Sequence, residues 1–218
     1  MAREKERMPI LNLDFIKNFD EVKDKLNIRL INYVANKEML QEIPYEKFLD
    51  LAIICVIEVC NDGAIKVNNN LFQMWNIEQK ELFEIAKENT QKIQPPIGQN
   101  MVDIINSMFG GSDKTEGMDK FRTDINPMYV LTNKGKSFGA SVILYDGLLE
   151  KLANEMNSDL IIIPSSVHEV IILPYTKDMD ELNITSMIRD INGTEVEIEE
   201  ILSNHPYFYM RDVRNITM

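Results

Sequence analysis

The stretch MYVLTNKGKSFGASVILYDGLLEKLANEMNSDLIIIPSSVHEVIILP, residues 128–174, decides the fold. Its hydrophobic pattern, continued toward the C-terminus, predicts helices over 147–157 and 179–192. Strands are predicted by runs of apolar and β-branched residues, over 128–132, 137–145, 160–163, 168–173 and 207–210. Short connections between successive strands favour antiparallel pairing, because a parallel pair needs a crossover of about a dozen residues. This half of the chain therefore has the predicted order β-β-α-β-β-α-β.

Helices dominate the predicted structure before this stretch. Apolar residues recur at helical spacing after Asp20 and predict a first helix over 20–35. A shorter helical segment is expected over 37–42. Asn76, with Gln79 three residues further on, forms a capping-box pattern that predicts the start of a longer helix.

One β-hairpin is predicted among these helices. The apolar run over 51–59 is followed by the turn residues Asn61-Asp62-Gly63 and by an alternating run over 64–68. The fold class is therefore α+β: N-terminal helices with a hairpin, then a mostly antiparallel sheet packed by helices.

The composition along the chain predicts four segments. Residues 1–12 are expected to be a disordered N-terminal segment, and residues 13–109 a helix, hairpin and helix region. Residues 110–124 begin GGSDKTEGMDK, which is rich in glycine and charge, and are expected to form a mobile linker. Residues 125–218 form the C-terminal α+β region. Whether the two regions are one domain or two is left open.

The composition excludes several classes of protein. The 218 residues include 23 Lys and Arg against 35 Asp and Glu, for a formal charge of −12. Binding to nucleic acid or to an anionic membrane needs clustered basic residues, which this chain lacks. No apolar run approaches the roughly 20 residues that span a bilayer, and the opening MAREKER has no apolar signal sequence. A cytoplasmic protein is therefore expected.

The segment around Gly135-Lys136-Ser137 is similar to the end of a phosphate-binding P-loop. The full pattern needs a glycine where Val130 stands, and a helix after the loop. The sequence predicts a strand there instead. Asn133-Lys134 is similar to a guanine-reading loop, but Lys136 stands where the acidic residue is needed. A hairpin turn with a solvated basic tip explains the segment better than nucleotide binding.

A weak catalytic hypothesis centres on Ser165, Ser166 and His168, which together suggest a nucleophile and a base. Thr132 and Asn133 would join them if the two turns lie at one end of the sheet. Such a site also needs an orienting carboxylate and an oxyanion hole, and the sequence locates neither. The alternative is a polar turn that carries a hydrogen-bonded histidine.

No metal site or cofactor is predicted. His168 and Glu169 are adjacent in a predicted strand, so their side chains point to opposite faces and do not readily share an ion. Cys55 and Cys60 lie in one apolar run and are expected to be buried as small hydrophobic residues. The acidic run of Glu195, Glu197, Glu199 and Glu200 lacks the pattern of a calcium-binding loop and is expected to be a solvated face.

Three strings of the chain form a recognisable set: FLDLAIICVIEV at 48–59, LFQMWNIEQKELFEIAKENT at 71–90, and the stretch at 128–174. With them the chain resembles an uncharacterised family of bacterial proteins of unknown function, over about residues 18–209. The resemblance implies a helix-hairpin-helix region before a C-terminal half of this kind. It supplies no catalytic residue and no ligand. Because such proteins often extend further at the N-terminus, it leaves open a preceding domain.

These observations favour a non-enzymatic binding or interaction module with a protein or peptide partner, met at exposed apolar or Met-rich surface or along a sheet edge. The first alternative is a small hydrolase or transferase at Ser165, Ser166 and His168. The second is an acidic decoy or inhibitor that presents its carboxylates to a basic partner. Association of the chain with itself is left open.

Overall fold

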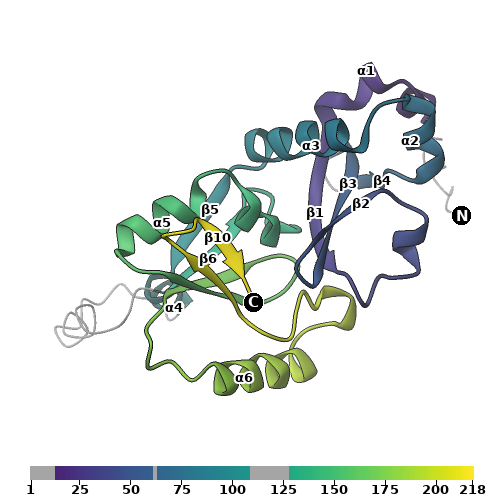
Figure 1. Ribbon diagram of the computed structural model, residues 1–218. Coiled ribbons are helices and arrows are strands. Elements are labelled where there is room, and N and C mark those ends of the chain that lie inside the picture. Colours follow the sequence, from purple (N-terminus) through teal and green to yellow (C-terminus); the bar gives the residue numbers. More distant parts are fainter. Residues whose placement is uncertain (1–12, 61–62, 109–127) are drawn as a thin grey trace, which may run out of the picture.

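The computed structural model describes residues 13–60, 63–108 and 128–218, which form two antiparallel sheets with helices around them (Figure 1). The α+β class predicted from the sequence is therefore confirmed. The predicted N-terminal segment 1–12, the predicted linker 110–124 and the hairpin residues Asn61 and Asp62 lie outside the described residues.

The first sheet is built around one long central strand. Its strands are β1 (Leu26–Asn32), β2 (Tyr45–Phe48), β3 (Leu51–Cys60) and β4 (Gly63–Lys66). β1 pairs with β3 along one edge, from Leu26 opposite Ile57 to Asn32 opposite Leu51. β2 and β4 share the other edge of β3, and β3 with β4 forms the predicted hairpin. With a partner on each edge, residues 51–57 of β3 are all buried.

The second sheet has the strand order β10-β9-β7-β8-β6-β5, and all its pairs are antiparallel, as expected. Its strands are β5 (Pro96–Asn100), β6 (Tyr129–Asn133), β7 (Leu160–Pro164), β8 (Val170–Pro174), β9 (Tyr207–Met210) and β10 (Asn215–Thr217). β5 precedes the predicted linker, yet it forms an edge of this sheet. Chain from both sides of the linker thus contributes to the second sheet.

Six α-helices and five 3₁₀ segments are present among the described residues. The α-helices are α1 (Phe19–Val22), α2 (Asn69–Trp75), α3 (Gln79–Ile93), α4 (Met101–Met108), α5 (Leu148–Met156) and α6 (Glu181–Thr194). The 3₁₀ segments are η1 (Asp14–Lys17), η2 (Lys23–Lys25), η3 (Met39–Gln41), η4 (Gly139–Leu144) and η5 (Ile198–Glu200). α3 packs beside β1, where the Ile28 N–H donates to Thr90 Oγ1 (2.8 Å).

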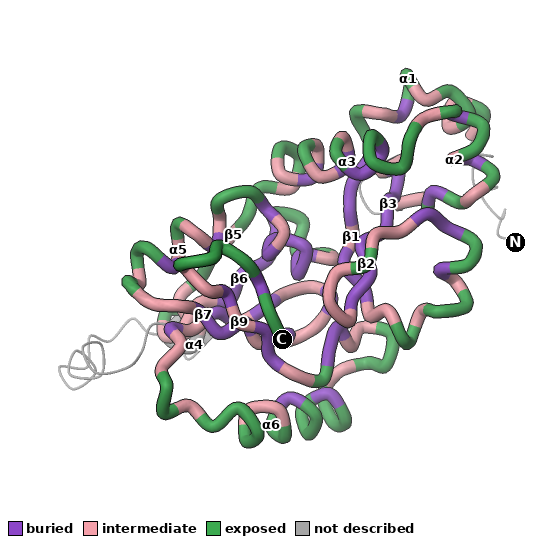
Figure 2. Tube along the Cα trace, viewed as in Figure 1, coloured by how far each residue is buried: buried purple, intermediate pink, exposed green. Residues whose placement is uncertain are grey.

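One hydrophobic cluster joins the two sheets. It includes Leu26 and Leu30 of β1, Leu82 of α3, and Leu160 and Ile162 of β7, all fully buried. Figure 2 shows this burial running through the strands, while α6 is exposed along most of its length. A smaller cluster on the other face of the first sheet contains Ile31, Leu40 and Ile54. The shared cluster holds the two sheets in one packed unit.

The predicted helix over 20–35 is wrong, because residues 26–32 form strand β1. The run Leu-Asn-Ile-Arg-Leu-Ile-Asn satisfies the two-residue period of a strand as well as helical spacing. Pairing with the apolar strand β3 decides between the two, since it buries Leu26, Ile28 and Leu30 on one face. The helical segment expected over 37–42 is reduced to η3.

The strand predicted over 137–145 is also wrong, because η4 occupies most of it. A Cβ on Gly139 would overlap Thr132 Oγ1 and the carbonyl oxygen of His168, so the backbone passes too close to its neighbours for a side chain. The Ala140 N–H donates to the Val167 carbonyl (3.1 Å) instead of to a ladder partner. The capping prediction at Asn76 is wrong as well. This residue ends α2 in the left-handed conformation, and Glu78 precedes α3.

Candidate functional site

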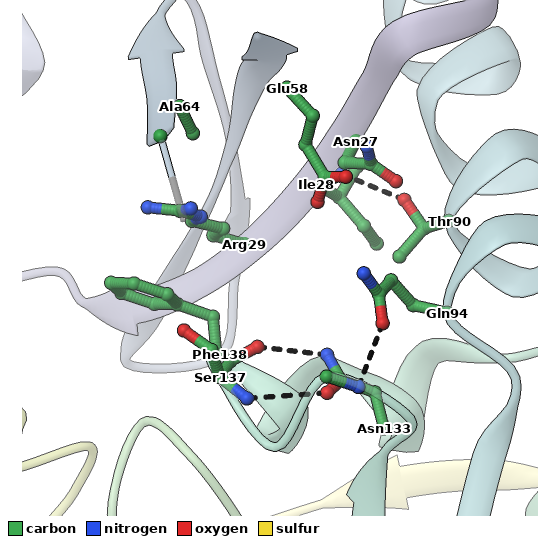
Figure 3. Close-up of a pocket in the computed structure, with 12 residues that line it drawn as sticks. Asn27, Ile28, Arg29, Glu58, Ala64, Thr90, Gln94, Asn133, Ser137 and Phe138 are labelled. Atoms are coloured by element: carbon green, nitrogen blue, oxygen red, sulfur yellow. Dashed lines mark hydrogen bonds between the residues drawn. The ribbon is translucent and has the colours of Figure 1, made fainter. Parts of the chain in front are cut away.

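A cleft of about 200 Å³ lies between the first sheet and the turn that follows β6 (Figure 3). Its lining comes from five parts of the chain: β1, β3, β4, the C-terminal end of α3, and the turn over residues 133–138. The lining residues are mostly polar, and those used below are Asn27, Arg29, Glu58, Thr90, Gln94, Asn133, Ser137 and Phe138. Pockets for drug-sized ligands are larger, at roughly 300–1,000 Å³, so this cleft suits a compact ligand.

Strand alternation places the two charged residues of the cleft on one face of the first sheet. Leu26, Ile28 and Leu30 face the main core, so Asn27 and Arg29 face the other way. Arg29 is opposite Ile54 of β3, and Glu58 lies four residues further along β3, on the same face. A cation and a carboxylate therefore line the cleft from neighbouring strands.

The Arg29 guanidinium rests on an aromatic ring and has no polar partner. Its central carbon lies 3.9 Å from the centre of the Phe138 ring. In the part of the chain that is described, it makes no hydrogen bond and no ion pair within 4.0 Å. The side chain is half-buried, and burial lowers the pKa of the guanidinium, while the nearby charge of Glu58 opposes that shift. Arginine stays protonated at neutral pH even so, because its ordinary pKa is far higher.

The turn that carries Phe138 is tightly bonded internally. Asn133 Nδ2 donates to the Ser137 carbonyl (2.9 Å), and the Ser137 N–H donates back to Asn133 Oδ1 (3.3 Å). The Gly135 N–H donates to Gln94 Oε1 (2.9 Å), which ties the turn to the end of α3. The N–H groups of Lys136 and Phe138 are also bonded. No backbone N–H of residues 134–138 is left to cradle a phosphate, which supports the turn interpretation over a P-loop.

Lys136 and Phe138 both adopt the left-handed backbone conformation, with φ of 51° and 49°. A bulky residue is strained there, by about 1–3 kcal/mol, and persists only when its surroundings hold it. The surroundings do so here, because the Phe138 N–H donates to His168 Nδ1 (3.2 Å) and its ring lies 5.6 Å from the His168 ring. These two contacts with His168 hold the Phe138 ring in the position on which Arg29 lies.

Asn27 forms another wall of the cleft and carries an unsatisfied group. The residue is 3% exposed, and its Oδ1 has no hydrogen-bond partner among the described residues. Its Nδ2 makes one long bond, to the Lys25 carbonyl (3.3 Å). An unpaired buried carbonyl costs about 1–3 kcal/mol, so Asn27 holds an acceptor that the described residues leave unused.

His168 joins the turns that the sequence prediction had connected. Its carbonyl accepts from Thr132 Oγ1 (2.8 Å), and Asn133 follows Thr132 at the end of β6, so the turn after β6 lies beside His168. The ring Nδ1 accepts from the Phe138 N–H, so Nε2 carries the hydrogen of the neutral ring and donates to Glu200 Oε1 (3.2 Å). Both ring nitrogens therefore serve the packing of this turn.

The two serines lie near His168 without contacting its ring nitrogens. Ser166 Oγ accepts from the His168 backbone N–H (3.0 Å), and Ser165 Oγ donates to Glu169 Oε1 (3.4 Å). A serine nucleophile needs its hydroxyl within hydrogen-bond reach of a base. The geometry brings the predicted residues together but gives neither serine the imidazole as a base.

The sequence prediction missed a second polar cluster at the junction of the two sheets. Asp50 lies in the turn between β2 and β3, and its Oδ1 accepts from Tyr207 Oη (2.6 Å). Its Oδ2 accepts from Ser203 Oγ (2.9 Å) and lies 3.2 Å from His205 Nε2. Tyr207 is fully buried, and burial together with the bond to Asp50 raises the pKa of its phenol. We call these four residues the Asp50 cluster. It ties the first sheet to β9.

The other predictions about sites are accounted for more briefly. No group of three or more His, Cys, Asp or Glu within the described ranges is placed to hold a metal ion. Cys55 is buried, and burial raises the pKa of its thiol. Glu195, Glu197 and Glu199 are exposed, as expected, while Glu200 accepts from His168. None of the described helices is long and apolar enough to cross a membrane.

Comparison with known proteins identifies the family and no characterised relative. Neither the curated proteins nor the solved structures gave a match. A family model described as "Family of unknown function (DUF5688)" matches residues 1–211. The resemblance to an uncharacterised family, inferred from the three sequence strings, is thereby confirmed. Because the match covers nearly the whole chain, this protein belongs to the DUF5688 family.

Proposed function

We propose that this protein is a non-enzymatic binding module whose ligand places an anionic group against Arg29 in the cleft. The proposal keeps the cytoplasmic location that the sequence indicates. The observation that carries it is the state of Arg29: a half-buried guanidinium without a hydrogen bond or an ion pair among the described residues.

The energetics of Arg29 support this proposal. Removing a cation from water costs several kcal/mol unless a counter-charge or hydrogen bonds replace the lost hydration. Contact with an aromatic ring returns about 0.5–2 kcal/mol of this. A carboxylate or a similar anion can accept two parallel hydrogen bonds from a guanidinium. Such an anion is the partner that Arg29 lacks among the described residues.

The two polar clusters in the described part of the chain contain no activated nucleophile, which favours binding over catalysis. Neither Ser165 nor Ser166 contacts a ring nitrogen of His168. Ser203 and His205 both contact Asp50, an arrangement that leaves the hydroxyl bonded to the carboxylate and not to the imidazole. In both clusters the polar groups satisfy one another.

The experiment is an NMR titration of the arginine side chains with acetate, propionate and butyrate. The Nε–Hε resonance of Arg29 is identified by its loss in Arg29→Gln. We expect it to shift saturably with the carboxylates, with dissociation constants in the millimolar range typical of such small ligands. The matched reference is Arg189, which is exposed on α6 and is identified through Arg189→Gln.

The proposal fails if the Arg29 resonance does not move, or moves only linearly and in parallel with that of Arg189. Melting temperatures give a second readout. Saturating carboxylate should raise the melting temperature of the wild type and of Arg189→Gln, because a ligand that binds only the folded state stabilises it. Arg29→Gln should show no such rise.

A second candidate function rests on the surface of α6. Met187 and Ile191, one helical turn apart, are 44% and 45% exposed, and the exposed carboxylates of Glu195, Glu197 and Glu199 follow the helix. An apolar stripe beside acidic residues fits a basic amphipathic peptide. A synthetic Lys- and Leu-rich helix should bind the wild type with strong salt dependence and bind Ile191→Asp more weakly. If the peptide binds the wild type and Ile191→Asp equally well, α6 is not the binding surface and this second function is rejected.

A further inference from the structure

We infer that the ligand of the cleft is a compact zwitterion, with its anionic group on Arg29 and a protonated amine on Glu58. This inference rests on the proposed function and names the class of ligand. The inference is carried by one observation: Arg29 and Glu58, which have opposite charges, line the same small cleft without forming an ion pair within 4.0 Å.

Neither charge has a partner of its own. Arg29 and Glu58 lie on neighbouring strands and on one face, and no oxygen of Glu58 comes within 4.0 Å of a guanidinium nitrogen. Among the described residues Glu58 makes no other ion pair or hydrogen bond through its carboxylate. Phe138 holds the guanidinium on its ring, away from Glu58. A molecule with both charges can satisfy both residues at once, as a simple anion cannot.

The remaining wall favours a small polar ligand. Thr90 Oγ1 donates to the Ala86 carbonyl, Asn133 Nδ2 donates to the Ser137 carbonyl, and Gln94 Oε1 accepts from the Gly135 N–H. These bonds fix the three side chains as the polar wall of the cleft. Asn27 differs, because its Oδ1 has no partner and its single anchor is long. This oxygen is an unused acceptor on the wall that Asn27 forms beside Glu58, and an ammonium group is a donor of the kind it lacks. The volume of about 200 Å³ suits a ligand of amino-acid size.

The test compares three matched series that differ in charge and length. The zwitterions are glycine, β-alanine and 4-aminobutyrate; acetate, propionate and butyrate lack the amine; methylamine, ethylamine and propylamine lack the carboxylate. Each is titrated against the wild type, Arg29→Gln and Glu58→Gln, with the Arg29 Nε–Hε resonance and the melting temperature as readouts. Glu199→Gln, an exposed residue, is the control for the loss of one negative charge.

We expect the zwitterion of best length to bind the wild type about tenfold more tightly than its carboxylate counterpart. Glu58→Gln should abolish that difference and leave carboxylate binding in place, and Glu199→Gln should change neither. Backbone NMR spectra verify that each variant is folded. The way in which affinity changes with the chain length of the zwitterion reports the distance between the binding positions at Arg29 and Glu58.

Three results would overturn the inference. The first is equal affinity for zwitterion and carboxylate, and the second is a preference for the zwitterion that survives in Glu58→Gln. Either leaves the proposed function standing, because carboxylates still bind at Arg29. The third is a ligand-free crystal structure in which the Glu58 carboxylate pairs directly with the Arg29 guanidinium. If none of the nine compounds moves that resonance, the proposed function fails too.

Discussion

Two charged side chains lie where the sheets meet, and their surroundings are opposite. Asp50 accepts hydrogen bonds from Tyr207 and Ser203 and lies beside His205, so its charge is satisfied within the protein. Arg29 lies on Phe138 with no polar partner in the described chain. A partly buried charge can thus be paired within the protein, as Asp50 is, or be left without an internal partner, as Arg29 is. The bonds of Asp50 stabilise the fold, whereas we propose that Arg29 pairs with the anionic group of a ligand.

The same contrast appears in the neighbouring side chains. Asn192 donates to the Ser203 carbonyl (2.9 Å), so the Asp50 cluster is bonded to α6 as well. The cleft has instead an unpaired carbonyl on Asn27. Backbone strain does not separate the two regions, because Leu49 beside Asp50 has a φ of 55° and Phe138 in the cleft has one of 49°. Unsatisfied polar groups gather at sites that serve function at some cost to stability. Mutations in the two regions should therefore behave differently.

The largest effect is expected from Asp50→Ala. Removal of the carboxylate leaves the buried hydroxyls of Tyr207 and Ser203 without their acceptor, and we expect a loss of about 3 kcal/mol in the free energy of unfolding. Urea denaturation measures it. The control is Asp212→Ala, which removes an exposed carboxylate and should cost less than about 0.5 kcal/mol. Similar values for the two variants would contradict a stabilising role of the Asp50 cluster.

A smaller effect is expected from Tyr207→Phe, at about 1.5 kcal/mol near neutral pH, because one hydrogen bond to a charged group is lost. The variant also changes the response to alkali. The raised pKa of Tyr207 means that above about pH 10 the unfolded chain releases a proton that the folded chain keeps, so stability falls as the pH rises. Each such group contributes about 1.4 kcal/mol per pH unit until its folded pKa is reached.

The slope of stability against pH between about 10 and 12 should therefore be shallower in Tyr207→Phe than in the wild type. A slope remains, because burial also raises the pKa of Tyr145 to about 12 and that of the Cys55 thiol. Denaturation at a series of pH values measures it. An unchanged slope would mean that Tyr207 ionises as readily in the folded protein as in the unfolded chain.

The smallest effect on stability is expected from Arg29→Met. The variant loses the contact of the cation with the ring but no longer buries an unpaired charge, so the change should lie within about 1 kcal/mol of zero. Its binding of carboxylates should nevertheless be lost. Thermal melts without propionate measure the change in stability, and melts with propionate measure whether the carboxylate still binds. A loss of several kcal/mol would instead make Arg29 a structural residue, like Asp50.

The sequence predicted the second sheet better than the first. β7 and β8 are short, continuous apolar runs bounded by prolines or polar turns, and few other structures satisfy such a pattern. β1 has an ambiguous pattern that only its pairing with β3 resolves. Gly139 gives no local sign that its backbone passes against Thr132, so η4 was taken for a strand. Long-range packing decided both elements.

The two polar regions were harder to predict for the same reason. Asp50 lies 153 and 157 residues from its partners Ser203 and Tyr207, and no local pattern connects them. Arg29 carried a usable signal, a charged residue between Ile28 and Leu30, but only if the segment is recognised as a strand. His168 was predicted either as a weak catalytic base or as a hydrogen-bonded histidine in a polar turn, and the structure gives it hydrogen bonds to Phe138 and Glu200. Its role as acceptor for the Phe138 N–H depends on a backbone conformation that the sequence does not reveal.

The most direct test of the contrast between Arg29 and Asp50 is a crystal structure of the protein grown with 4-aminobutyrate. We predict the ligand in the cleft, with its carboxylate oxygens within hydrogen-bond distance of the Arg29 guanidinium and its amine beside Glu58, while the Asp50 cluster keeps its internal bonds. A structure in which Arg29 pairs directly with Glu58 and the cleft holds no ligand would contradict the account.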